Sequence, residues 1–161
     1  YVSKFEYIKN RLLSFFNTET GTHNFQSDKA IDSITSGGFF GKGIGEGTLK
    51  NRVPEAHTDY IISVISEEFG VIAIMLILII FLSFIYSIFK KVENETDDTA
   101  RLILIGSGSL ILLQAMIHIG VNIRLFPTTG MTLPFLSYGG SSIISISIFS
   151  GVILNLTKRK V

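Results

Sequence analysis

The sequence of 161 residues contains no cysteine and few charged residues. The absence of cysteine excludes disulfide bonds and thiolate metal sites, and it leaves the redox compartment open. Charged residues make up 17% of the chain, against about 25% in soluble domains, and this deficit indicates a membrane protein. The net charge of +1 provides no general attraction to a nucleic-acid backbone, so we expect no nucleic-acid partner.

Two common site signatures are also missing. No His-x-x-x-His or Glu-x-x-His pattern occurs, so the sequence predicts no dedicated zinc site. Residues 37–47 are rich in glycine, but the spacing is not G-x-G-x-x-G and no strand–turn–helix pattern surrounds it, which excludes a dinucleotide-binding fold. We expect this stretch to let a loop fold tightly over the membrane surface. Because the chain starts at Tyr1 rather than Met and shows no signal peptide, we expect it to be a piece of a longer protein.

Three uncharged segments are long enough to cross a membrane as helices. Two of them are Phe69–Phe89 and Leu102–Ile123. The third lies within residues 125–157, where two prolines and a glycine between Pro127 and Pro134 exclude a regular helix. That helix is therefore expected to start within residues 135–141 and to end at Thr157.

These segments predict an all-α, polytopic integral membrane protein. We expect a large loop over residues 1–59, with one short amphipathic helix near Ile8–Phe16. The membrane helices are expected at about residues 60–90, 101–123 and 135–157 of a single membrane domain.

The orientation follows from basic residues in the short connections. Lys90, Lys91 and Arg101 flank the first hairpin, three basic residues follow the third span, and the second connection carries Arg124 alone. We therefore expect the hairpin and the C-terminus to be cytoplasmic. The loop of residues 1–59 and the segment from Pro127 are then extracytoplasmic.

The segment Pro54–Asp59 places an imidazole and a carboxylate just before the first span. Charged groups are costly near hydrocarbon, and they persist there when they have chemistry or a partner. If a helix begins near Thr58, capped by Thr58 or Asp59, then Asp59, Ser63, Ser66 and Gly70 share one small, polar face. Such a face suits close packing or a water-filled cavity. Asp59 can serve as a general base for a substrate hydroxyl, or it can be a helix cap and nothing more.

Other polar groups have more than one interpretation. His57 can orient Asp59, bind a metal or bond to the loop backbone. A divalent cation such as Mg²⁺ or Mn²⁺, held by Asp59 and a substrate diphosphate, stays open. In the second span, a polar stripe predicts hydrogen bonds between helices, with substrate contact as the alternative. Its members are Ser107, Gln114, His118 and Asn122.

Three segments of the chain resemble one family when they are taken in order. They are Ser36–Lys50, Pro54–Gly70 and Pro127–Ser142, with His-Thr-Asp and Leu-Pro-Phe-x-Ser-Tyr-Gly-Gly-Ser-Ser as the most specific blocks. On these motifs the chain is similar to the SEDS family, named for shape, elongation, division and sporulation. The details match its division member better than its elongation member.

The resemblance implies a bundle of about ten helices in the bacterial inner membrane, at the division septum. This chain would contribute the large outer loop and the last three helices. Family members are peptidoglycan glycosyltransferases that polymerise lipid II, release undecaprenyl diphosphate and act with a class B penicillin-binding transpeptidase and other division proteins. The essential aspartate corresponds to Asp59. The residues to which we assign substrate binding are Glu55, His57, Lys42, Lys50, Arg52, Ser137 and Ser141.

The chain departs from the family pattern at several positions. Ile8 replaces an Arg, Thr18 replaces a Pro, and Lys29-Ala30 replaces the usual Gln-Ser. Arg124 stands where a Gly is common before the Pro-Thr-Thr-Gly loop. These changes affect the outer loop and leave Asp59 and its neighbours intact.

Two other functions are consistent with the same residues. A transporter that flips a lipid-linked precursor would use the same polar stripe and cavity. A division scaffold without catalytic activity would use Asp59 only as a cap and the outer loop for partners.

Overall fold

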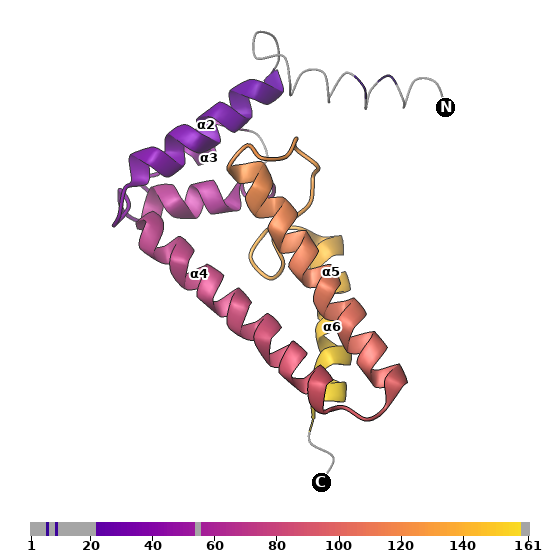
Figure 1. The fold of residues 1–161 in the computed structure, drawn as a ribbon. Coiled ribbons are helices and arrows are strands. Elements are labelled where there is room, and N and C mark those ends of the chain that lie inside the picture. Colours follow the sequence, from indigo (N-terminus) through magenta and orange to yellow (C-terminus); the bar gives the residue numbers. More distant parts are fainter. Residues whose placement is uncertain (1–5, 7–8, 10–21, 54–55, 159–161) are drawn as a thin grey trace.

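The computed structural model describes residues 6, 9, 22–53 and 56–158 of the chain, and the regular structure in this part is helical throughout (Figure 1). Three long helices are accompanied by two elements in the N-terminal loop. The elements are α2 (Thr22–Gly37), α3 (Leu49–Arg52), α4 (Ile61–Asn94), α5 (Asp98–Asn122) and α6 (Gly140–Thr157).

Helices α4, α5 and α6 are each long and apolar enough to cross a membrane. This confirms the three predicted spans, with α4 and α5 extending a few residues beyond the expected ends. The connection between α4 and α5 is short, and Asp97 caps α5 by accepting a hydrogen bond from the Thr99 amide (2.9 Å). The start of α4, the end of α5 and the start of α6 therefore meet at one end of the molecule, together with α2 and α3 (Figure 1).

Aliphatic side chains hold the three long helices together along the C-terminal part of α4. The buried members are Ile85, Ile88, Val92, Leu104, Ile111, Ile146 and Ile153. Gly108 permits close contact between α5 and α4, because a Cβ atom there would lie 3.2 Å from Cγ2 of Ile88. At Gly106, by contrast, no atom lies within 4 Å of such a Cβ atom.

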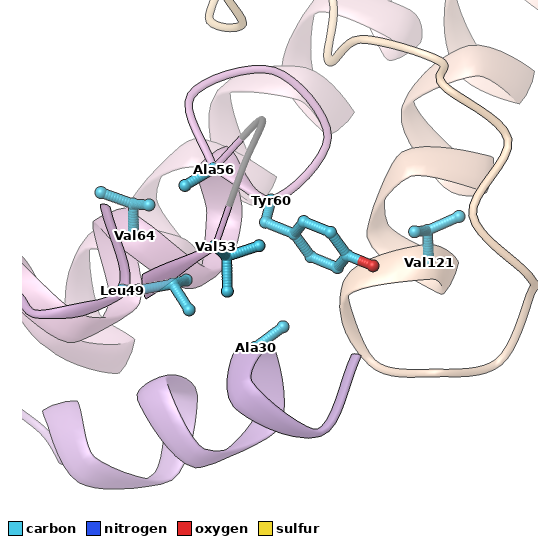
Figure 2. Packing of buried hydrophobic residues seen from close by; sticks show 7 residues of the cluster. All are labelled: Ala30, Leu49, Val53, Ala56, Tyr60, Val64 and Val121. Atoms are coloured by element: carbon cyan, nitrogen blue, oxygen red, sulfur yellow. The ribbon is translucent and has the colours of Figure 1, made fainter. Parts of the chain in front are cut away.

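The N-terminal loop contains more regular structure than the sequence predicted. Helix α2 packs along the first part of α4, although its residues are largely polar and show no apolar stripe. Figure 2 shows the small core against which it packs, in which the Tyr60 side chain lies near Ala30 and Val121. The full cluster is Ala30, Leu49, Val53, Ala56, Tyr60, Val64 and Val121. The helix expected near Ile8–Phe16 lies outside the described residues.

Helix α4 is interrupted at Gly70, where φ is 80° and ψ is −178°. The break changes the direction of the helix (Figure 1) and separates the carbonyls of Glu67 and Glu68 from the amides four residues later. Those carbonyls accept hydrogen bonds from the amides of Lys42 (2.8 Å) and Gly43 (3.0 Å). The prediction that Gly70 continues a regular helical face was wrong, because it did not consider the glycine-rich loop as a bonding partner.

The amides beyond the break are satisfied by the same loop. Val71 donates to the Gly38 carbonyl (3.0 Å) and Ile72 donates to the Phe39 carbonyl (3.4 Å). A Cβ atom at Gly70 would lie 2.2 Å from the Phe39 oxygen, so only glycine permits this approach. We call residues 37–43 and the break at Gly70 the glycine clamp. It is the tight folding that the glycine-rich sequence predicted.

Candidate functional site

The residues 56–60 form a turn immediately before α4, which we call the Asp59 turn. Helix α4 begins at Ile61, and its N-cap residue is Tyr60, which makes no side-chain cap bond. The helix thus starts later than predicted, and the assignment of Thr58 or Asp59 as its N-cap residue was wrong. Asp59 is 8% exposed, while His57 is exposed.

The segment after α5 holds the first part of the Asp59 turn. The amide of Tyr138 donates to the His57 carbonyl (3.2 Å). The hydroxyl of Ser137, which is 4% exposed, donates to the Thr58 carbonyl (2.9 Å) and accepts from the Leu133 amide (2.8 Å). The Ser-Tyr pair of the third motif therefore fixes the backbone of the His-Thr-Asp motif.

The polar stripe of α5 holds the rest of the turn. Nε2 of His118 lies 3.2 Å from the Thr58 carbonyl oxygen, and Nδ2 of Asn122 donates to the Asp59 carbonyl (3.0 Å). Since a carbonyl oxygen only accepts, Nε2 carries the proton of the imidazole. Nδ1 of His118 then accepts from Asn122 (3.3 Å). The stripe was predicted to bond between helices; these contacts reach the turn before α4, and the bonds from Ser63 of α4 to Asn122 join two helices.

A third member of the stripe bonds on another side of α5. The Nε2 atom of Gln114 donates to the Thr132 carbonyl (2.9 Å) and also approaches the hydroxyl of Ser142 (3.5 Å). Ser141 lines the same cavity of about 340 Å³, between α5, α6 and the loop before α6. The structure therefore separates two predicted substrate contacts: Ser141 borders an open cavity, whereas Ser137 is buried against the Asp59 turn.

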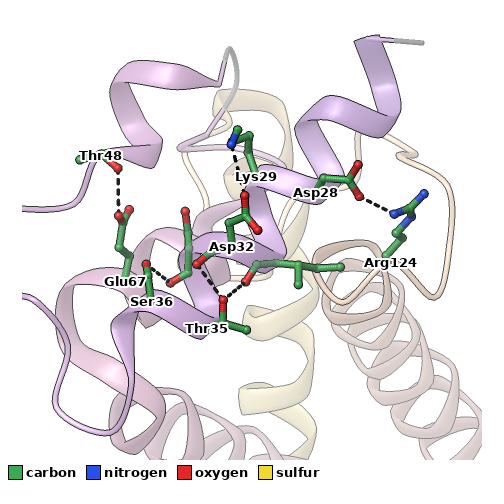
Figure 3. Close-up of polar contacts among 10 residues, drawn as sticks. Asp28, Lys29, Asp32, Thr35, Ser36, Thr48, Glu67 and Arg124 are labelled. Atoms are coloured by element: carbon green, nitrogen blue, oxygen red, sulfur yellow. Dashed lines mark hydrogen bonds and ion pairs between the residues drawn. The ribbon is translucent and has the colours of Figure 1, made fainter. Parts of the chain in front are cut away.

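Helix α5 ends in a Schellman motif directly after Asn122. The amide of Leu125 donates to the Gly120 carbonyl (2.7 Å) and the amide of Arg124 donates to the Val121 carbonyl (3.1 Å). Arg124 occupies the left-handed position with φ of 59°, where glycine is usual. This explains why glycine suits that position better. The side chain of Arg124 forms an ion pair with Asp28 of α2 (Figure 3).

One buried carboxylate was not selected from the sequence. Glu67 is 1% exposed, and its side chain accepts from Nζ of Lys42 (2.9 Å), the hydroxyl of Thr48 (3.1 Å) and the Leu49 amide (3.0 Å). Figure 3 shows the contact with Thr48. The sequence signal was a glutamate next to an apolar span, but the partner lies 25 residues away, so the pairing could not be read from local spacing.

Basic side chains of the N-terminal loop gather around a cavity of about 140 Å³ between α2, α3 and α4. Lys42 and Arg52, both predicted to bind an anionic group, line it, as does Lys29. Lys42 is paired with Glu67, and Lys29 is paired with Asp32 (3.2 Å). The side chain of Lys50 and the whole of Glu55 lie outside the described part of the chain.

The described residues contain no group of three or more His, Cys, Asp or Glu side chains that could hold a metal ion. The divalent cation considered at Asp59 stays a prediction.

Comparison with known proteins agrees with this architecture. The model of the FtsW/RodA/SpoVE family, described as cell cycle protein, matches residues 1–161. The "Probable peptidoglycan glycosyltransferase FtsW" of Enterococcus hirae is 40% identical over 162 residues, covering 99% of this chain and 41% of the relative. The protein of the same name from Caulobacter vibrioides is 36% identical over 157 residues, covering 97% and 40%.

Among solved structures, the chain is similar to one in "Structural coordination of polymerization and crosslinking by a peptidoglycan synthase complex". The TM-score is 0.73 with 26% identity, over 94% of this chain and 41% of that one. The chain thus spans about 41% of the length of the first of these relatives.

Proposed function

This chain belongs to the FtsW/RodA/SpoVE family of cell cycle proteins, and on that basis we propose that the complete protein is a peptidoglycan glycosyltransferase. It polymerises lipid II during division, in the bacterial inner membrane at the septum. It acts with a class B penicillin-binding transpeptidase, and its C-terminus is cytoplasmic. The names of the relatives support the activity, and a synthase complex among the similar structures supports the partnership.

The observation that carries the proposal is the support around Asp59. In the turn that contains it, the carbonyls of His57, Thr58 and Asp59 each accept a hydrogen bond from a distant segment of the chain. A carboxylate on such a turn is held at the end of the helical bundle with little freedom. Catalytic groups need this fixed placement, because small displacements from the reactive geometry reduce the rate strongly.

In the proposed reaction, the carboxylate of Asp59 accepts the proton of the acceptor sugar's 4-hydroxyl. The oxygen attacks the anomeric carbon of the donor and forms the new glycosidic bond. The bond from that carbon to the diphosphate breaks, and undecaprenyl diphosphate leaves with the electron pair. A single displacement inverts the anomeric carbon. A well-placed general base contributes on the order of 10²–10⁴-fold to the rate.

The leaving diphosphate needs positive charge nearby. Among the predicted basic residues, Lys42 and Arg124 already have carboxylate partners. Arg52 lines the polar cavity and has no ion pair with any side chain that the structure describes. We therefore assign the diphosphate contact first to Arg52. A divalent cation such as Mg²⁺, bound by the diphosphate and Asp59, would neutralise further charge.

The test is polymerisation of lipid II by the complete protein with its transpeptidase partner, comparing Asp59→Ala with Asp98→Ala. Asp98 is an exposed aspartate at the opposite end of α5, so it controls for the loss of a carboxylate as such. We expect a loss of at least about 100-fold for Asp59→Ala and unchanged activity for Asp98→Ala. Near-normal glycan chains from the Asp59 variant would rule out the proposed role.

The same preparation separates the rival functions. In proteoliposomes, glycan polymer and lipid flipping are scored in parallel. A transporter would move the lipid without forming glycosidic bonds. A scaffold would form neither product, and its loop variants would lose partner recruitment while Asp59→Ala had no effect.

A further inference from the structure

Asn122 is the last residue of α5, and it is completely buried. Its Oδ1 atom accepts from the amide (3.1 Å) and the hydroxyl (2.8 Å) of Ser63. Its Nδ2 atom donates to the Asp59 carbonyl (3.0 Å) and the His118 carbonyl (2.9 Å). The amide orientation is fixed, because a backbone amide faces one end of it and backbone carbonyls face the other.

Through these contacts Asn122 joins Asp59 to the first turn of α4. One end of its side chain holds the carbonyl of Asp59, and the other holds the first turn of α4 at Ser63. The N-cap residue of α4 makes no side-chain cap bond, so Asn122 satisfies from another helix an amide that a cap would otherwise serve. The path of the chain from Asp59 to Ser63 is therefore set by one buried amide.

We propose that Asn122 is a positioning residue for the reaction assigned to Asp59, a claim that depends on the proposed function. It does not reach the sugar. It fixes the Asp59 backbone, and thereby the point from which the carboxylate extends toward the acceptor hydroxyl. Ser137 has the same role at the neighbouring Thr58 carbonyl, where its hydroxyl donates at 2.9 Å.

The most informative variant is Asn122→Asp, because it keeps the size and the acceptor for Ser63 but loses the donor to the Asp59 carbonyl. The matched control is Asn94→Asp in α4. Asn94 is exposed, and its Nδ2 atom also donates to a backbone carbonyl, that of Lys90 (2.8 Å). The control thus makes the same chemical change far from Asp59.

The measurement is the kinetics of lipid II polymerisation by the complete protein with its transpeptidase partner. We expect Asn122→Asp to lower kcat by at least about 10-fold while KM for lipid II stays within about 3-fold, because orientation affects the reacting complex more than binding. The control should match the unaltered protein. An unchanged kcat, or a rise in KM alone, would overturn the positioning role.

Ser137→Ala gives a second, uncharged test if Asn122→Asp does not fold. It removes the hydroxyl from the Thr58 carbonyl, and we expect a smaller fall in kcat, of about 3- to 10-fold, again with KM little changed. A Ser137→Ala protein with normal kcat would contradict the proposal. The two hypotheses fail separately: activity in Asp59→Ala removes the general base, whereas an inactive Asp59→Ala with an unimpaired Asn122→Asp removes only the positioning role.

Discussion

The glycine clamp and the Asp59 turn solve the same problem at the same end of the molecule by different means. In both, the backbone is not helical beside an apolar bundle, where unsatisfied backbone groups are costly. In the clamp, backbone bonds to backbone, and glycines permit the approach. In the Asp59 turn, side chains of α5 and the loop before α6 bond to backbone carbonyls.

The difference indicates what each region can tolerate. A backbone-to-backbone contact depends on close approach, so it fails where an added Cβ atom would meet the opposing backbone, as at Gly70. A side-chain-to-backbone contact depends on the identity of a few polar residues. The first arrangement suits a rigid attachment of the N-terminal loop, and the second suits a site whose geometry depends on individual side chains.

The largest effect on stability should come from Gly70→Ala, which places a Cβ atom at the closest contact of the clamp. The left-handed φ of 80° and the approach to the Phe39 oxygen at 2.2 Å are both incompatible with alanine. We expect a loss of about 3 kcal/mol or more in the free energy of unfolding, measured as thermal unfolding of the complete protein in detergent.

Gly38→Ala separates the two causes. Gly38 also has a positive φ, of 58°, but no atom lies within 4 Å of a Cβ there. The loss should be only about 1 kcal/mol, from backbone strain alone. Equal losses in the two variants would show that close approach contributes nothing to the clamp.

The next largest effect concerns Glu67, whose carboxylate adds hydrogen bonds beside the glycine clamp, which is otherwise held by backbone contacts. Glu67→Gln removes the charge that Lys42, Thr48 and the Leu49 amide share. Breaking a buried pair costs about 3–5 kcal/mol; because Lys42 is 37% exposed, we expect about 2 kcal/mol. Glu95→Gln, which removes the i,i+4 pair with Lys91, should change unfolding by less than about 0.5 kcal/mol. Similar melting shifts for both variants would refute the special role of Glu67.

The smallest expected effect compares two serines one turn apart in α4. Ser63 and Ser66 are both buried, at 0% and 1% exposure. The Ser63 hydroxyl donates to Asn122 (2.8 Å), whereas the Ser66 hydroxyl has no hydrogen-bond partner within the described structure. Ser66 borders an apolar cavity of about 230 Å³.

Replacement by alanine should therefore have opposite results at the two sites. Ser63→Ala is expected to destabilise the protein by about 1 kcal/mol, and Ser66→Ala to leave its stability unchanged or raise it slightly. Parallel thermal unfolding of both variants provides the measurement. A clear loss in Ser66→Ala would mean that its hydroxyl has a partner in the complete protein, and the contrast would disappear.

Much of the fold could be predicted because a long apolar segment in a membrane forms a helix, which satisfies its own backbone groups. The three spans and the start of the last helix after Pro134 came from length, charge and proline placement alone. The stripe of Gln114, His118 and Asn122 was also visible, since polar residues within a span rarely face lipid. Helix α2 could not be predicted in the same way, because its residues carry little periodic signal and its stability comes from packing on α4.

The sequence by itself determined that the chain forms three helices long and apolar enough to span a membrane, and that a carboxylate lies just before the start of the first. Only the tertiary structure decided how that carboxylate is held, that α4 breaks at Gly70, and that Glu67 pairs with Lys42. The physical reason is the range of the interactions. Span formation depends on local hydrophobicity, whereas the bonds to the Asp59 turn join residues about 60 to 80 positions apart.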